Sequence, residues 1–509
     1  MKPKMLAAAA MLAPALAACQ TATPAVVAPA PAPVRASLLI EDVTVIDPES
    51  RSVTAARDVL IDGHRIIAVV PHDSIAIAAE RTVEASGHYL MPGLFDMHTH
   101  SSFAPVHRSS LKLMRANGVT GAREMGSDCK GGGGGLTMCI DAMQASRAAI
   151  EAGDLVGPRL VQLSSSKVNS NRPEDGDEEI LLYSPTDADE AAASVAWLAE
   201  RGVELIKISE EMTPGAVRGL LAAANEAGIA VGGHVPLMFS IGDLSALGLT
   251  SVEHARDLPL DCSTHGAAFR AAVGAALRGE GDWPDRSKLP AMARDTFDAD
   301  LCAAQVAAMA AGGTYYVPTH ITREFDVRAG EAAYVEDARR QYLPAMQLEH
   351  WQGDIERTAS VSAERKADLA DFFELGLRTT KIAHEAGVKI MVGTDANDTM
   401  TFPGFSVHDE MRHLVAAGLS EMDVLRAATT VPADYLGRSD DFGGVRAGKL
   451  ADLLLLTANP LDDIEHSDAI AAVIFDGRLD DRETLDRYLE EVRDWVALAN
   501  AEGQAGDAD

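Results

Sequence analysis

The chain has 509 residues, of which 47% are hydrophobic and 24% charged, a composition typical of a globular protein rather than of a disordered one. Its formal net charge of −32 excludes binding to nucleic acid through a basic surface, since a phosphate backbone exchanges its counterions for lysine and arginine. The length allows a (β/α)8 barrel of about 250 residues together with a second, smaller domain.

The first residues have the pattern of an export signal, predicted over residues 1–18. Two lysines precede an apolar run over residues 5–18 that is too short to span a membrane. The run ends in Leu-Ala-Ala before Cys19, which resembles the bacterial lipobox, and this resemblance implies a lipidated Cys19 as the new N-terminus. By the same resemblance, Gln20 implies export to the periplasmic side of the outer membrane. An ordinary cleaved signal, leaving a soluble periplasmic or secreted protein, is the alternative.

Both ends of the folded chain have short β patterns. Residues 19–35 are rich in alanine and proline and predict a semi-extended tether, so the lipid anchor is the only membrane contact we expect. The next segment contains turn-separated apolar runs, which predict strands at 37–40, 43–46, 59–61 and 65–70. Similar runs return only at 451–456 and 472–477. We therefore expect a small composite β-sandwich built from residues 36–85 and 440–480.

Between these ends, residues 86–439 alternate between strand and helix patterns, which favours parallel strands with right-handed crossovers. Eight strands are predicted, at 94–97, 119–124, 159–163, 204–208, 230–233, 251–253, 314–317 and 389–393. The clearest helices are expected at 188–201, 214–227, 301–311 and 375–386. The fold class is therefore α/β, a (β/α)8 TIM barrel with the composite sandwich beside it. A C-terminal helix and tail occupy 481–509.

Two connections of this barrel, residues 255–300 and 319–373, are much longer than typical barrel loops. Specificity usually lies in long loops at the C-terminal rim of a barrel. We therefore expect these two insertions to form walls of the substrate site.

Four cysteines follow Cys19, an even number that predicts disulfides in an oxidising compartment. Four cysteines permit three pairings. We predict Cys129 with Cys139, closing a glycine-rich loop, and Cys262 with Cys302, clamping the first insertion. None of them has the spacing of a zinc–thiolate site.

His98 and His100 mark a metal site, because side chains two apart on a strand point the same way. Four further potential ligands each end or nearly end a short apolar run, and a barrel presents such strand ends at one rim. These ligands are Lys207, His234, His254 and Asp395.

The motif Pro-Gly-Leu-Phe-Asp-Met-His-Thr-His ending at His100, the later ligands in their order, and Gly-Lys-Leu-Ala-Asp-Leu from Gly448 resemble the amidohydrolase superfamily. The most similar branch is that of the imidazolonepropionase-like and prolidase-like metallohydrolases, and the resemblance spans residues 40–477. It implies two divalent metal ions, usually zinc. One ion would be held by His98, His100 and Asp395, the other by His234 and His254, with an N-carboxylated Lys207 bridging them.

The resemblance also implies a metal-bridging hydroxide as nucleophile, with Asp395 taking its proton and delivering it to the leaving nitrogen. Two further residues are weaker candidates. Arg123, next to the end of the second barrel strand, is a candidate to bind a substrate carboxylate through its forked donors, and a structural ion pair is the equal alternative. His320 follows the seventh strand and is a candidate to bond the substrate carbonyl or the oxyanion.

We therefore expect an exported amidohydrolase that cleaves the C–N bond of a short peptide or N-acyl amino acid, as a dipeptidase or carboxypeptidase does. A lactonase, cyclic amidase or phosphoesterase could use the same binuclear centre. From other classes, the alternatives are a non-catalytic envelope binding lipoprotein and a metal-free enzyme that uses Glu124 or Glu253. Whether the protein forms a homo-oligomer stays open.

Overall fold

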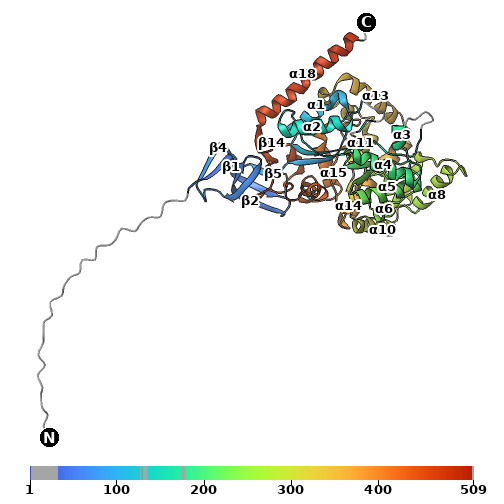
Figure 1. Cartoon of the computed structure of the whole chain (residues 1–509), viewed down its shortest axis with the longest axis horizontal. Helices are drawn as coiled ribbons and strands as arrows, with labels where there is room; N and C mark the ends of the chain where they lie inside the picture. The colour runs from blue at the N-terminus through green and yellow to red at the C-terminus, as the bar shows by residue number, and fades with distance from the viewer. Residues whose placement is uncertain (2–31, 127, 130–135, 173–177, 507–509) are drawn as a thin grey trace.

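The computed structural model describes residue 1 and residues 32–126, 128–129, 136–172 and 178–506. The expected signal over residues 1–18, Cys19 and nearly all of the linker lie outside the described residues. No helix in the described part of the chain is both long and apolar enough to cross a membrane. Figure 1 shows the blue N-terminal strands at one side of the molecule and most helices gathered at the other.

Strands from both chain ends join, as expected, but in one eight-stranded sheet rather than in two separate sheets packed as a sandwich. The order is β15-β14-β13-β5-β1-β2-β3, and β4 pairs with β1. Apolar side chains from both ends, such as Ile40, Leu453 and Ile474, form one buried cluster that joins the two segments. The strands are β1 (Val34–Asp47), β2 (Ser52–Asp62), β3 (Arg65–Pro71), β4 (Ile77–Glu84), β5 (Tyr89–Pro92), β13 (Leu453–Leu456), β14 (Ile470–Phe475) and β15 (Arg478–Asp481).

The two strands expected at 37–40 and 43–46 are one strand, β1. Its register against β2 shifts between Ile40 and Val43, and Asp42 between them has a positive φ of 54°. A β-bulge therefore replaces the expected turn, because one residue with left-handed backbone is enough to bend a strand without ending it.

Seven parallel strands form two further sheets close to the predicted positions. One sheet contains β6 (Leu94–Thr99), β7 (Val119–Glu124) and β8 (Arg159–Leu163); the other contains β9 (Leu205–Ile208), β10 (Ala230–Gly233), β11 (Ser251–Glu253) and β12 (Tyr315–Val317). Parallel bridges from Ser164 to Leu205 and from Val168 to Ile208 connect the segment after β8 to β9. The expected α/β class, with parallel sheets and crossover helices, is confirmed.

The eighth predicted strand, residues 389–393, is not a regular strand. Its Ile390 makes one parallel bridge to Tyr316 of β12, while the Val392 N–H donates to the carbonyl of Ala427. The carbonyl of Val392 in turn accepts from β6. Because its hydrogen bonds are divided among three neighbours, no continuous ladder forms with any one of them.

Helices cover the parallel strands and fill both insertions. They are α1 (His107–Ala116), α2 (Ile140–Ala152), α3 (Glu178–Leu182), α4 (Ala188–Glu200), α5 (Pro214–Ala227), α6 (Ile241–Ala246), α7 (Asp257–Asp261), α8 (Gly266–Leu277), α9 (Leu289–Asp295), α10 (Ala299–Gly312), α11 (His320–Arg328), α12 (Ala332–Val335), α13 (Ala345–Ala359), α14 (Ala363–Glu385), α15 (Phe405–Ala416), α16 (Glu421–Ala427), α17 (Thr430–Tyr435) and α18 (Arg482–Gly506). The helix predicted at 375–386 begins earlier, because Ser362 caps the N-terminus of α14 by accepting from the backbone N–H of Arg365. The insertions are therefore helical rather than extended loops.

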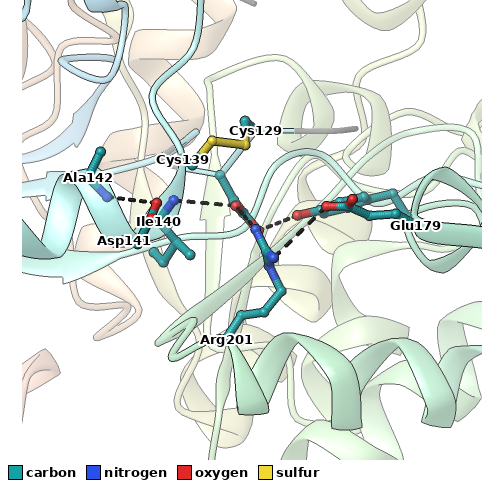
Figure 2. The surroundings of a disulfide bond; sticks show 9 residues. Cys129, Cys139, Ile140, Asp141, Ala142, Glu179 and Arg201 are labelled. Atoms are coloured by element: carbon teal, nitrogen blue, oxygen red, sulfur yellow. Dashed lines mark hydrogen bonds and ion pairs between the residues drawn. A yellow bond between two sulfur atoms is a disulfide. The ribbon is translucent and has the colours of Figure 1, made fainter. Parts of the chain in front are cut away.

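Both predicted disulfides are present, Cys129–Cys139 and Cys262–Cys302. Figure 2 shows Arg201 extending from α4 toward the first disulfide and Glu179. The guanidinium of Arg201 donates to the buried carboxylate of Asp128 at 2.7 Å. The segment after β7 is thus tied down by one covalent and one ionic contact.

We predict that the Cys262–Cys302 bond stabilises the fold more than the Cys129–Cys139 bond. The cysteines are separated by 40 residues in the first case and 10 in the second. By restricting the unfolded chain, the Cys262–Cys302 bond is expected to add about 4 kcal/mol to the free energy of unfolding, and the Cys129–Cys139 bond about 3 kcal/mol. Denaturant unfolding of the two Cys→Ser pair variants measures both values, and a larger loss for the Cys129–Cys139 pair would contradict the prediction.

Candidate metal centre

The predicted ligands lie where parallel strands end. β6 is buried along its whole length and carries His98, with His100 one residue beyond its end. Lys207 lies within β9, and His234 and His254 directly follow β10 and β11. Because parallel strands end at the same edge, these side chains reach one place.

Two of the predicted ligands have a left-handed backbone conformation, which changes the direction of the chain at the point where the strand ends. His254 and Asp395 have φ values of 67° and 66°, a conformation that costs non-glycine residues about 1–3 kcal/mol and clusters at functional sites. Gly393 lets the Asp395 segment approach β6, since a Cβ at Gly393 would collide with Val317 and lie 2.9 Å from the backbone nitrogen of His98.

The carboxylate of Asp395 lies at the centre of the group. Its Oδ1 is 3.2 Å from His98 Nε2 and 3.0 Å from His100 Nε2, and its Oδ2 is 3.7 Å from His254 Nδ1. Ligand atoms of His98, His254 and Asp395 all lie within 4.8 Å of one another. One cation can therefore reach several of these atoms at once.

The other predicted ligands adjoin this cluster. Lys207 Nζ is 3.3 Å from His100 Nε2, and the ring of His234 is 5.1 Å from that of His254. His98 Nε2 is buried, and its 3.2 Å contact with Asp395 Oδ1 lacks the geometry of a hydrogen bond, an arrangement that suits a cation between the two atoms. Zinc prefers imidazole nitrogens and carboxylate oxygens, and the carboxylated form of Lys207 would add oxygen donors of the same kind. The residues present fit a binuclear centre.

Burial shifts four basic groups of this cluster toward their neutral, metal-binding forms, whereas Asp395 and Glu253 outweigh burial at His98 and raise its pKa. Burial lowers the pKa of Lys207 to about 8 and that of His100 to about 4, and it holds the pKa values of His234 and His254 well below their usual range. Neutral imidazole and neutral amine carry the lone pairs that ligation, or carbon dioxide addition at Lys207, requires.

Residues beside the ligands orient them. His98 Nδ1 lies 2.8 Å from Glu253 Oε2, and His254 Nδ1 lies 2.8 Å from Thr319 Oγ1. Such partners fix the tautomer and ring direction of ligating histidines. The roles of Thr319 and Glu253 were not predicted from the sequence. The Glu-His pair at the end of β11 was a usable signal for Glu253, whereas nothing local marked Thr319.

Arg123 does not contact the cavity, and the substrate role predicted for it needs correction. Its side chain is 0% exposed, and its Nη2 donates to both carboxylate oxygens of Glu253, at 2.8 and 2.7 Å. Its Nε donates to the carbonyl of Met97. These contacts engage the guanidinium inside the protein, so Arg123 supports Glu253 and, through it, His98.

His320 is also buried away from the cavity lining. Its Nε2 forms a 3.0 Å hydrogen bond with Thr380 Oγ1, and burial followed by the nearby His413 lowers its pKa well below the usual range. The direct contact predicted between His320 and the substrate is therefore not seen in this structure.

A cavity of about 470 Å³ opens on the centre. Five predicted ligands line it, together with four apolar and five polar side chains: His100, Lys207, His234, His254, Asp395, Phe103, Leu136, Met346, Trp351, Lys167, Gln347, His350, Asn397 and Asp398. The sixth ligand, His98, lies behind Asp395. Helix α13 of the second insertion supplies part of the wall, as expected. No described residue of the first insertion, 255–300, lines this cavity, so the wall expected from that insertion is not found here.

Neither carboxylate proposed for a metal-free reaction lines this cavity. Glu124 is 0% exposed and accepts hydrogen bonds from Ser101 and Ser102, while Glu253 is held by Arg123 and His98. Both carboxylates act as buried acceptors that position neighbouring groups.

We predict that Arg123→Met lowers the free energy of unfolding by about 3–5 kcal/mol, because it leaves the buried carboxylate of Glu253 without its cation. Adding Glu253→Gln to that variant should restore part of the loss. The matched control is Arg278→Met, whose exposed pair with Glu280 contributes at most about 1 kcal/mol. Urea unfolding of the four proteins, wild type included, tests the coupling, and equal losses for Arg123→Met and Arg278→Met would refute it.

Comparison with protein families gives a match of residues 89–479 to the amidohydrolase family. Adenine deaminase from Deinococcus radiodurans is 46% identical over 63 residues, which make up 12% of this chain and only 11% of the length of that enzyme. A solved Xaa-Pro dipeptidase with bound methionine in its active site has a TM-score of 0.62 at 21% identity, covering 87% of this chain and 99% of its own. For a bottromycin amidohydrolase the TM-score is 0.67 at 21% identity, with 90% of each chain covered. These structural likenesses concern the fold, while the family match extends over most of the sequence: the chain belongs to the amidohydrolase family.

Proposed function

We propose that this protein is a metal-dependent hydrolase that cleaves the C–N bond of a short peptide or N-acyl amino acid, as a dipeptidase or carboxypeptidase does. One observation carries the proposal: the predicted ligands, from distant segments of the chain, meet at a single cavity of about 470 Å³. Beside the ligands, its wall combines apolar and polar side chains, which suits a small organic substrate that carries polar groups.

The expected architecture remains part of this proposal. The bridges from Ser164 to Leu205, from Tyr316 to Ile390 and from Thr99 to Ala396 support a ring of parallel segments closed as a (β/α)8 barrel over residues 86–439. The eight-stranded sheet supports a composite domain from 36–85 and 440–480.

His98, His100 and Asp395 would hold one divalent ion, and His234 and His254 the other, with carboxylated Lys207 between them. When bound, two zinc ions lower the pKa of an attacking water and polarise the scissile carbonyl. Lys207 is suited to carboxylation, because burial lowers the pKa of its amine to about 8 and so favours the neutral form.

Asp395 moves the proton. Burial raises its pKa, but His98 and His254 outweigh burial and hold the pKa well below the usual range, so the carboxylate is ionised at neutral pH. It can accept a proton from the attacking water. Once protonated, it is a strong acid toward an amine nitrogen, and it therefore returns the proton to the leaving group.

We also propose that the protein is exported as a lipoprotein anchored through Cys19 on the periplasmic side of the outer membrane. The basic start, the apolar run and the lipobox-like residues before Cys19 support this location.

The proposal is tested by screening the zinc-loaded protein against a library of dipeptides and N-acyl amino acids. We expect turnover of at least one member, two zinc ions per chain, and loss of turnover on chelation or in His98→Ala. Metal-free protein with full activity would overturn the metal mechanism, and an absence of turnover across amides, lactones and phosphoesters would favour a binding protein.

For Lys207→Ala we predict loss of most activity and of one or both metals, because two cations then lack their bridging anion. A small carboxylate such as acetate should restore part of the activity by filling the space. Metal analysis by mass spectrometry is the first measurement, and full metal content in this variant would count against the bridge.

For Asp395→Asn we predict a folded protein whose turnover is slower by about 100-fold or more, as expected on losing a proton-transfer group. Circular dichroism serves as the control for folding. Wild-type turnover in this variant would exclude the role assigned to Asp395.

A further inference from the structure

A second cavity, of about 500 Å³, lies between the two helical insertions. Apart from Leu237, all of its lining residues come from segments 255–300 and 319–373. None of its lining residues lines the cavity of the candidate metal centre, and the function proposed above assigns this second cavity no role.

This cavity concentrates positive charge in a protein whose net charge is −32. Its lining has two carboxylates, Asp257 and Asp326, against five guanidinium groups: Arg256, Arg286, Arg323, Arg357 and Arg365. Four of these guanidinium groups pair with carboxylates: Arg256 and Arg286 with Glu210, Arg323 with Asp326, and Arg357 with Asp354. Among the described residues, Arg365 is the cation of this lining that has no such partner, and it leaves the cavity with an excess of positive charge.

The arginines keep unused donors. Arg286 Nη2 donates to Glu210 Oε2 at 2.6 Å, and Arg323 Nη1 lies 2.8 Å from Asp326 Oδ2. Arg365 donates to the carbonyl of Ser287, and no carboxylate of the described residues lies within 4.0 Å of its nitrogens. Because a guanidinium carries five N–H donors in a planar fork, an anion entering the cavity finds several of them free.

The rest of the lining is apolar. Leu237, Leu260 and Phe372 are at least nine-tenths buried, and three other lining residues extend this wall: Leu289, Pro290 and Leu369. A hydrated inorganic ion gains nothing from such a wall, whereas an organic anion buries its hydrocarbon part there.

We propose that this cavity binds an organic carboxylate with an apolar body, held by the fork of Arg286 and Arg365. Glu210 connects the cavity to the metal centre, because its Oε1 lies 3.6 Å from His234 Nδ1 while its other oxygen accepts from Arg286. Arg256 pairs with the same Oε1, so Glu210 is held from both sides, and a carboxylate that competes for Arg286 removes one of its two arginine partners. The ligand is either the far end of an extended substrate or a separate small carboxylate.

The test is isothermal titration calorimetry of the full chain with 4-phenylbutyrate, which has no C–N bond to be hydrolysed. We expect it to bind at least tenfold more tightly than the neutral 4-phenylbutanol. The variant with both Arg286→Gln and Arg365→Gln should lose at least tenfold in affinity. Arg278→Gln, at an exposed arginine outside the cavity, should bind as wild type.

Equal affinity for acid and alcohol, or unchanged affinity in the double variant, overturns the proposal. So does loss of binding in Lys167→Gln, which would place the probe in the cavity of the metal centre. If the double variant does not fold, Arg365→Gln alone gives the answer, since in the described structure it breaks no ion pair.

Kinetics with the best substrate from the screen separates the two sources of carboxylate. Competitive inhibition by 4-phenylbutyrate assigns the cavity to the far end of the substrate, whereas an altered kcat at unchanged KM assigns it to a separate ligand. Because the calorimetry needs no turnover, binding in a protein that hydrolyses nothing would sustain this inference while the proposed function fails.

Discussion

A continuous line of buried charged groups, from Arg123 through Glu253 and His98 to Asp395, holds the candidate centre together. Taking charges out of water is costly, and only close pairing with further hydrogen bonds repays that cost. Arg123 and Glu253 satisfy this condition through the carbonyl of Met97 and the hydroxyl of Ser251. Burial raises the pKa of Glu253, but the neighbouring Arg123 and His98 outweigh burial and lower this pKa to about 2. An ionised Glu253 in turn orients His98.

The backbone brings these groups together by ending its parallel strands at one edge. Strands β9 to β12 pair side by side in parallel, so their carboxyl ends lie next to one another. Lys207 and the histidines that follow β10 and β11 therefore face the same space. The last segment, 389–395, lies between β12 and β6 and forms hydrogen bonds with both, but no regular ladder with either. Its left-handed residue Asp395 then points back at the strand that carries His98.

The two insertions divide the surroundings of the centre into chemically different spaces. Helix α13 of the second insertion brings Met346 and Trp351 to the cavity of the metal centre. The arginine-lined cavity lies between α9 and α14, with Glu210 as the residue common to both neighbourhoods. The metal-binding residues and the inserted helices can therefore differ in role: the former hold the metals, and the latter decide which small molecules bind.

The amino-acid order by itself determined seven of the parallel strands, the positions of the candidate ligands at or near strand ends, and the joining of both chain ends through β-strands. These features are encoded locally, because apolar alternation and short apolar runs report burial within a few residues. The irregular course of 389–393, the bulge at Asp42, the choice among three disulfide pairings and the partner of Arg123 were decided by the tertiary structure. Each depends on residues far apart in the chain, such as Arg123 and Glu253, 130 positions apart, and no local pattern records which distant group will satisfy a buried charge.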